Sequence, residues 1–201
     1  MKKDIINSFG NVARIYEETS YLFKDFSAII SGKNFKNITG NSIGTTSVSK
    51  ALDASGYWLT RYAALFFKPI DQEANDPLLS VTVGFYNDEL EAVEPYLALG
   101  VVKGMDHVRK SWQYWWLYSP FINEGNNFEY FSETSGDEQK TNAPSMNEEI
   151  IRFKCTFDDS SYTWPKEGWF FAVPLLDVRD AKDVERLSRK IIELWTAKVV
   201  G

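Results

Sequence analysis

Three apolar segments follow one another in the middle of the chain, and they constrain the fold more than any other feature. They cover residues 57–68, 78–87 and 95–104, and each is bounded by Pro, Gly, Asn or Asp. The connections between them are too short for crossover helices, so we expect antiparallel pairing. Because the first and third segments are apolar on both faces, we also expect other parts of the chain to cover both sides of the sheet.

The C-terminal half of the chain adds further strands to this sheet. Residues 126–133 are expected to form a strand, and residues 149–159 and 168–177 are expected to form a hairpin. The segments 32–50 and 133–149 are polar and rich in turn-forming residues, which predicts flexible loops. No internal repeat or domain boundary is evident, so we expect a single domain over residues 1–201.

The N-terminal segment has the periodicity of a long amphipathic helix. Between residues 3 and 31, apolar residues recur at a spacing of three to four with charged residues between them. Gly32 is the expected C-terminal cap. An unbroken helix would be about 43 Å long, which is longer than a small domain is wide. It therefore either breaks near Thr19–Ser20 or projects at one end, and a projecting apolar stripe favours a homodimer.

The last segment with helical periodicity follows Asp180, which is a natural N-cap residue. An apolar stripe on this C-terminal helix is expected to face the sheet. The stripe consists of Val184, Leu187, Ile191, Leu194 and Trp195.

An unusually aromatic stretch, SWQYWWLYSPF, covers residues 111–121. A helix that starts near Asp106 and ends before Pro120 separates its charged and apolar residues better than a strand does. We therefore expect a middle aromatic helix whose tryptophans pack on the sheet. Its tyrosines Tyr114 and Tyr118 are better placed to line a pocket, since buried hydroxyl groups need partners that a ligand can supply.

The expected architecture is therefore α+β. It combines an antiparallel five- to six-stranded sheet with a long N-terminal helix, the middle aromatic helix and a C-terminal helix. This order of elements resembles sensory and ligand-binding domains of the profilin-like kind. The resemblance concerns the fold and involves no specific motif.

Charge and composition argue against several classes of partner. The net charge is −6 and the pI about 5.0, which disfavours nucleic acid and anionic membranes because both require concentrated positive charge. No segment has the run of ~18 apolar residues that a membrane span needs, and the N-terminus lacks the apolar run of a signal peptide. We therefore expect a cytoplasmic protein.

The chain contains few of the residues that usually act in catalysis or bind metal ions. It has one histidine, His107, and one cysteine, Cys155. A catalytic triad would have to use His107, yet no Gly-x-Ser-x-Gly motif accompanies it. Alternation through residues 150–157 places Cys155 inside the protein. We expect no cofactor, no metal site and no catalytic residue.

One arginine interrupts an apolar strand and is the first candidate for ligand binding. Arg61 could anchor the carboxylate or phosphate of a small ligand. Alternatively, it forms a salt bridge within the chain or lies at a sheet edge, where its side chain is exposed to solvent. The expected ligand is small and either anionic or aromatic. It would be contacted by Arg61, Tyr114, Tyr118, His107 and Arg109.

Two further aromatic residues, Tyr162 and Trp164, lie at the expected hairpin tip and are candidates for a partner-binding surface. Two functions follow from these residues. The first is a non-catalytic small-ligand-binding or sensory-type domain with an aromatic-lined pocket. The alternative is a protein-interaction or assembly module that acts through its N-terminal helix and exposed aromatics. An enzyme ranks third, since no catalytic motif is present.

Overall fold

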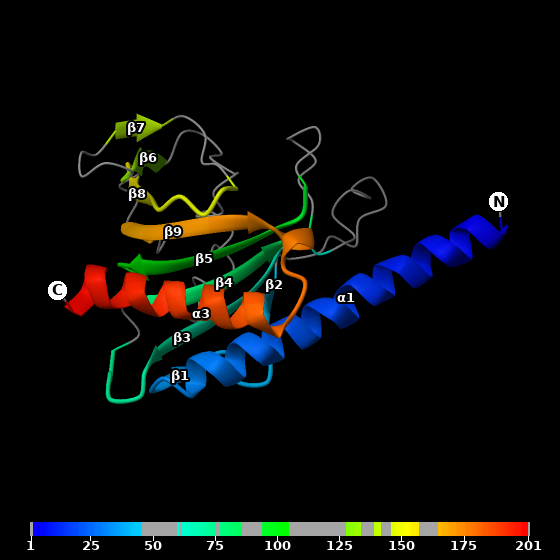
Figure 1. Ribbon diagram of the computed structural model, residues 1–201, viewed down its shortest axis with the longest axis horizontal. Helices are drawn as coiled ribbons and strands as arrows, with labels where there is room; N and C mark the ends of the chain where they lie inside the picture. The colour runs from blue at the N-terminus through cyan, green and yellow to red at the C-terminus, as the bar shows by residue number, and fades with distance from the viewer. Residues whose placement is uncertain are drawn as a thin grey trace.

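The computed structural model describes residues 2–45, 60, 62–74, 77–85, 94–104, 128–133, 139–141, 146–156 and 165–200. These residues form an α+β structure with one antiparallel sheet and two α-helices, α1 (Lys2–Ser31) and α3 (Ala181–Trp195) (Figure 1). A π-helical turn, η5 (Thr196–Val200), follows α3 directly. The aromatic helix expected between Asp106 and Pro120 lies outside the described residues.

The strands of the sheet follow the order β1-β3-β4-β5-β9-β8-β6-β7, and the short strand β2 also pairs with β3. All the neighbouring pairs are antiparallel. The strands are β1 (Phe35–Asn37), β2 (Gly44–Thr45), β3 (Tyr62–Pro69), β4 (Leu78–Gly84), β5 (Tyr96–Lys103), β6 (Phe128–Ser132), β7 (Gln139–Thr141), β8 (Ile151–Cys155) and β9 (Glu167–Pro174).

The sheet is larger than the five or six strands that the sequence predicts. Within the described ranges it has eight strands in series, with β2 beside them. The additional strands β1, β2 and β7 have only two or three residues each and lie in segments expected to be loops. They extend the sheet through backbone pairing, and strands this short carry no alternating pattern that a sequence could reveal.

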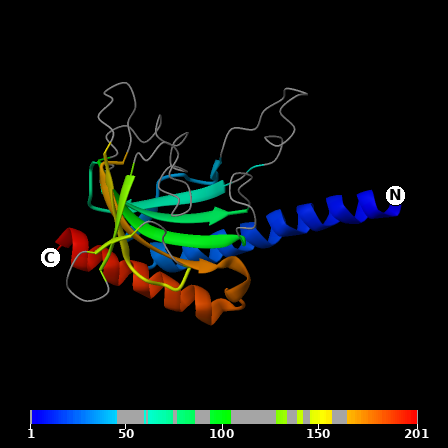
Figure 2. The same cartoon turned by 90° about the horizontal axis from the view of Figure 1, so that it is seen from above.

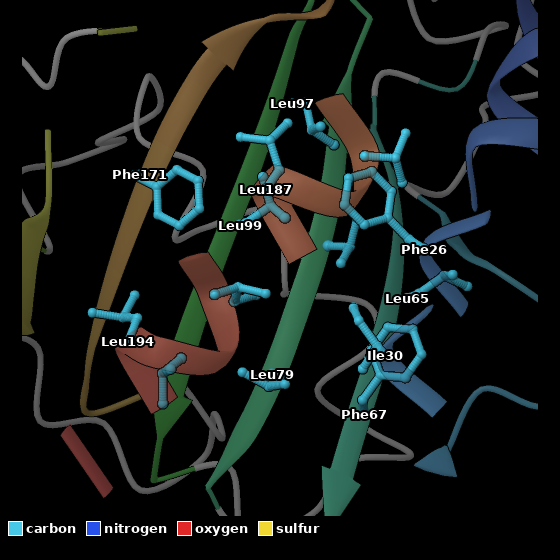
Figure 3. Packing of buried hydrophobic residues seen from close by; sticks show 14 of the residues in the cluster. Phe26, Ile30, Leu65, Phe67, Leu79, Leu97, Leu99, Phe171, Leu187 and Leu194 are labelled. Atoms are coloured by element: carbon cyan, nitrogen blue, oxygen red, sulfur yellow. The ribbon is translucent and has the colours of Figure 1, made fainter. Parts of the chain in front are cut away.

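Both faces of the central strands are buried, as the sequence predicts. One face packs against α1 and α3 in the larger apolar core (Figure 3). On the opposite face the side chains of alternate residues are equally buried and form a second apolar cluster. In β8 the predicted alternation is confirmed for Ile151 and Phe153, whereas Cys155 is only half-buried.

Helix α1 is continuous, so of the two alternatives for this segment the projecting helix is confirmed (Figures 1 and 2). Its C-terminal half lies on the sheet through Phe23, Phe26 and Ile30, each at most 4% exposed. The backbone N–H of Gly32 donates to the carbonyl of Ala28 at the helix end. Gly32 directly follows the last helical residue, as expected of a C-terminal cap, and the left-handed residue that turns the chain is Asn34, with φ of 65°.

Helix α3 begins where the sequence predicts. The carboxylate of Asp180 accepts hydrogen bonds from the backbone N–H groups of Lys182 and Asp183, at 2.8 and 3.2 Å. The five apolar residues of the predicted stripe are all buried against the sheet and α1. Local capping and helical periodicity therefore fix both the start and the orientation of this helix.

Candidate functional site: a groove beside helix α1

The N-terminal part of α1 extends beyond the sheet (Figure 2). Tyr16 is the first residue of α1 for which the described part of the chain shows a hydrogen bond to another element, because its hydroxyl donates to the carbonyl of Thr60 at 3.5 Å. The Tyr16 ring also meets that of Phe85 edge to face, at 5.2 Å between centroids. In the projecting part, residues 2–15, Ile6 is 61% and Ile15 is 49% exposed. This segment therefore exposes large apolar side chains to solvent.

A groove of about 630 Å³ lies where the projecting part of α1 meets the corner between β9 and α3. The corner contains a 3₁₀ turn, η4 (Leu175–Asp177). Leu176 on the corner is 71% exposed and Tyr21 on α1 is 51% exposed. The groove is lined by Asn11, Arg14, Ile15, Glu18, Thr19, Tyr21, Leu22, Asp25, Leu175, Leu176, Val178, Arg179, Asp180, Ala181 and Val184.

The corner wall of this groove is fixed by backbone hydrogen bonds that do not involve α1. The N–H of Leu175 donates to the carbonyl of Pro95 at 2.7 Å, and the N–H of Val178 donates to the carbonyl of Leu175 at 3.2 Å. The N–H of Arg179 donates to the carboxylate of Asp183 at 3.0 Å. Because each wall has its own anchors, the groove is a preformed feature of the fold.

Charged residues surround the apolar floor of the groove. Arg14, Glu18 and Asp25 come from α1, and Arg179 comes from the corner. The guanidinium of Arg179 approaches the carboxylate of Asp177 at 3.7 Å, and both side chains are exposed. An apolar floor with a charged rim is the surface that an amphipathic helix recognises in helix-in-groove complexes.

A second groove, of about 550 Å³, lies on the other side of α1. Its walls come from Tyr16, Phe23 and the 40–43 turn, with Phe85 at one end. Asn37 stabilises this turn, since its side-chain oxygen accepts from the N–H of Thr39 at 2.8 Å. Thr19 borders both grooves.

The sheet face opposite the helices contains a small polar patch within its apolar cluster. The hydroxyls of Ser80 and Thr82 lie 3.0 Å apart and are buried. Beside them the described residues enclose a void of about 10 Å³, room for at most one water molecule. The Tyr130 hydroxyl is buried and has no hydrogen-bond partner among the described residues, and burial raises its pKa above the ordinary value.

All the site residues that the sequence predicts lie outside the described residues. They are Arg61, Tyr114, Tyr118, His107, Arg109, Tyr162 and Trp164. The structure therefore does not test whether they form a pocket or a partner surface. Leu176, Tyr21 and Arg179 were not predicted as site residues. Residues 173–177 are predicted only as the end of a strand, although Pro174 and Asp177 indicate a turn.

Neither models of known protein families, nor curated protein sequences, nor solved structures match the chain. Interpretation of the grooves therefore rests on their geometry and chemistry. In the parts of the chain that the structure covers, no three His, Cys, Asp or Glu residues are grouped closely enough to hold a metal ion. Nor does any described helix combine the length and apolar character that a membrane crossing requires.

Two partly exposed ion pairs, from Glu148 to Arg186 and to Lys190, connect the segment before β8 to α3. Burial alone would raise the pKa of Glu148, but hydrogen bonds from Arg186 and Lys190 hold it below its ordinary value. The two cations lie 2.6 and 3.1 Å from the carboxylate oxygens. Glu148 also has a left-handed backbone, with φ of 65°, and its N–H donates to the carbonyl of Ala172.

We expect Glu148→Gln to lower the free energy of unfolding by about 1 kcal/mol at pH 7, because charge-assisted hydrogen bonds are lost. Because the pKa of Glu148 is lower in the folded state, its ionised carboxylate stabilises the folded protein fully at pH values above the ordinary pKa of 4.5. This stabilisation is lost as the pH falls through the folded-state pKa. The difference between variant and wild type should therefore shrink in acid. Urea unfolding at several pH values measures it.

Glu185→Gln is the matched control, since Glu185 pairs with Arg189 on the same helix but both side chains are more than 60% exposed. It should change stability by less than about 0.5 kcal/mol. Equal losses in the two variants, or a Glu148 effect that does not vary with pH, would contradict the assignment.

Proposed function

We propose that this protein is a non-catalytic interaction or assembly module that binds a protein partner through the projecting part of α1 and the groove beside it. One observation carries the proposal: residues 2–15 project from the sheet beside a preformed apolar groove with exposed Ile15, Tyr21 and Leu176. Exposed apolar surface of this kind, rimmed by charge, is characteristic of protein-binding sites.

The sequence of the projecting segment supports the same proposal. Residues 7–11 read NSFGN, and Asn, Ser and Gly together weaken the helix by roughly 2–3 kcal/mol relative to alanine. Isolated helices of this length are marginal in water even with good helix formers. Contacts with a partner would compensate for this weakness, and they would also cover Ile6, which is 61% exposed.

Hydrogen–deuterium exchange of the whole protein tests the proposal. We expect amides of residues 3–13 to exchange fast in dilute purified protein, because little packing protects this part of the helix. They should exchange at least about tenfold more slowly when the protein is concentrated or mixed with an extract of its source cells. Amides of α3 provide the internal control and should not change.

Fast exchange of residues 3–13 under every condition would refute an interaction function for this segment. The proposal would also be refuted if the extract slowed exchange in all elements equally, since that result indicates general stabilisation.

A ligand-binding function is the second candidate, and one observation favours it. Within the part of the chain that the structure describes, no group forms a hydrogen bond with the buried hydroxyl of Tyr130, which is costly unless another group satisfies it. It belongs to the apolar cluster of the sheet face that carries Ser80 and Thr82. A thermal-shift screen with small carboxylates, phosphates and aromatic compounds tests this. A supporting compound raises the melting temperature of wild type more than that of Tyr130→Phe.

A further inference from the structure

We infer that the partner of the projecting segment is the same segment of a second copy of this chain, paired antiparallel, with a twofold axis between residues 10 and 11. The inference rests on the proposed interaction function, because it names the partner and the geometry for that surface. It is carried by the residue spacing along α1 and by the distribution of charge on this helix.

The whole of α1 follows a heptad-like spacing, in which steps of four and three residues alternate. From Thr19 onward the residues at these positions are buried within the chain. Tyr16 and Val12 are half-buried, and the same spacing continues to residue 5, beyond the contacts with the sheet. The positions are Ile5, Phe9, Val12, Tyr16, Thr19, Phe23, Phe26 and Ile30.

The part of this row that precedes the buried positions is self-complementary in its spacing, and it ends at the half-buried Tyr16. Residues 5, 9, 12 and 16 are separated by four, three and four positions, a series that is the same in both directions. In an antiparallel pair, residue 5 therefore lies level with residue 16 of the second copy, and residue 9 with residue 12. A surface that matches itself in this way is what a twofold, isologous interface requires.

The charges of α1 select the antiparallel orientation. Lys2 and Lys3 lie at the N-terminal end of the helix, and Glu17 and Glu18 lie where the projecting part ends. Antiparallel pairing brings Lys3 of each copy level with Glu18 of the other. Asp4 then lies level with Glu17, so opposite charges meet at one of these two levels. Parallel pairing would place like charges together at both levels, and it would also align the two helix dipoles unfavourably.

The groove is positioned to receive the end of the second helix. With this alignment, residue 2 of one copy lies level with Thr19 of the other, and Thr19 borders both grooves beside α1. A paired segment of 12 residues is only about 18 Å long, which is short for a specific interface of ~1,000 Å². The groove, with Glu18 and Asp25 on its rim, supplies the additional surface.

Sedimentation analysis of the full chain between about 1 and 100 µM tests the pairing. We expect a species of twice 23.1 kDa for the wild type. Val12→Asp places a charge in the row and should weaken dimerisation at least about 30-fold. Asn7→Asp is the matched control, because Asn7 is exposed on the same segment but lies away from the row. It should dimerise like the wild type.

Circular dichroism and urea unfolding of both variants establish that they fold, so that a loss of mass reports association. A wild type that is monomeric at every concentration overturns the inference. A dimer that Val12→Asp leaves intact also overturns it, because the second copy would then bind elsewhere.

Spin labels test the orientation. A label at Lys3→Cys, in a background where the single native cysteine is replaced by Cys155→Ala, should give an interspin distance above about 25 Å. The two labels would be offset by 15 residues, or about 22 Å along the axis. A distance below about 20 Å indicates parallel pairing and overturns the antiparallel arrangement.

Failure of this inference and failure of the proposed function give different results. If the purified protein is monomeric but cell extract slows exchange of residues 3–13, the second-copy inference is wrong and an interaction with another protein remains. If no condition protects the segment, both are wrong.

Discussion

Replacing Phe26 with alanine is expected to lower the free energy of unfolding by about 3–5 kcal/mol. Phe26 is fully buried in the core between the sheet and the helices, in one cluster with Leu65 of β3 and Leu187 of α3 (Figure 3). Its removal loses transfer free energy and leaves a cavity between rigid elements that cannot collapse freely. Urea unfolding at low protein concentration measures the change through the midpoint and slope.

Tyr21→Ala is the control for Phe26→Ala, since it removes a ring of similar size from the same helix. Tyr21 is 51% exposed, so the variant should change stability by less than about 0.5 kcal/mol. Similar losses for the two variants would mean that α1 does not contribute its C-terminal half to the core as described.

Gly168→Ala is expected to cost about 3 kcal/mol, at the upper end of the range for overpacking. An added Cβ would lie 2.4 Å from the carbonyl oxygen of Val101 on the neighbouring strand and 2.6 Å from the ring of Phe153. The backbone of β5 cannot retreat without breaking its pairing with β9. Thermal and urea unfolding should both show the loss.

Gly10→Ala adds the same methyl group where nothing lies within 4 Å. In an exposed helix interior this change should stabilise the protein by about 1 kcal/mol. If Gly168→Ala and Gly10→Ala both lowered the free energy of unfolding, Gly10 would not lie on an open helix surface as described.

Local patterns in the sequence account for the central part of this fold. The strand that contains Leu79 and Val81 was predicted because these residues alternate with Ser80 and Thr82 between turn residues, which indicates a strand. Helix α3 was predicted from the carboxylate of Asp180 and a stripe at helical spacing, and both signals act within a few residues. The length of α1 left two alternatives, a break near Thr19–Ser20 or a projecting end, and the structure shows the projecting end.

The order of the strands could not be predicted in the same way. Strand β9 lies beside β5 although more than 60 residues separate them in the chain. This pairing depends on contacts between distant segments, which leave no local pattern. The same limit applies to the groove, because Ile15 and Leu176 come from opposite ends of the sequence. Only the exposed apolar residues of α1 could have indicated it.

The position of β9 also determines when the protein can fold during its synthesis. Strand β9 is the last strand in the chain, yet it lies in the interior of the sheet between β5 and β8. Until residues 167–174 leave the ribosome, the nascent β5 has an unsatisfied edge and the sheet cannot join its two halves. Such edges attract other chains, so protection by chaperones during translation matters most for this interval.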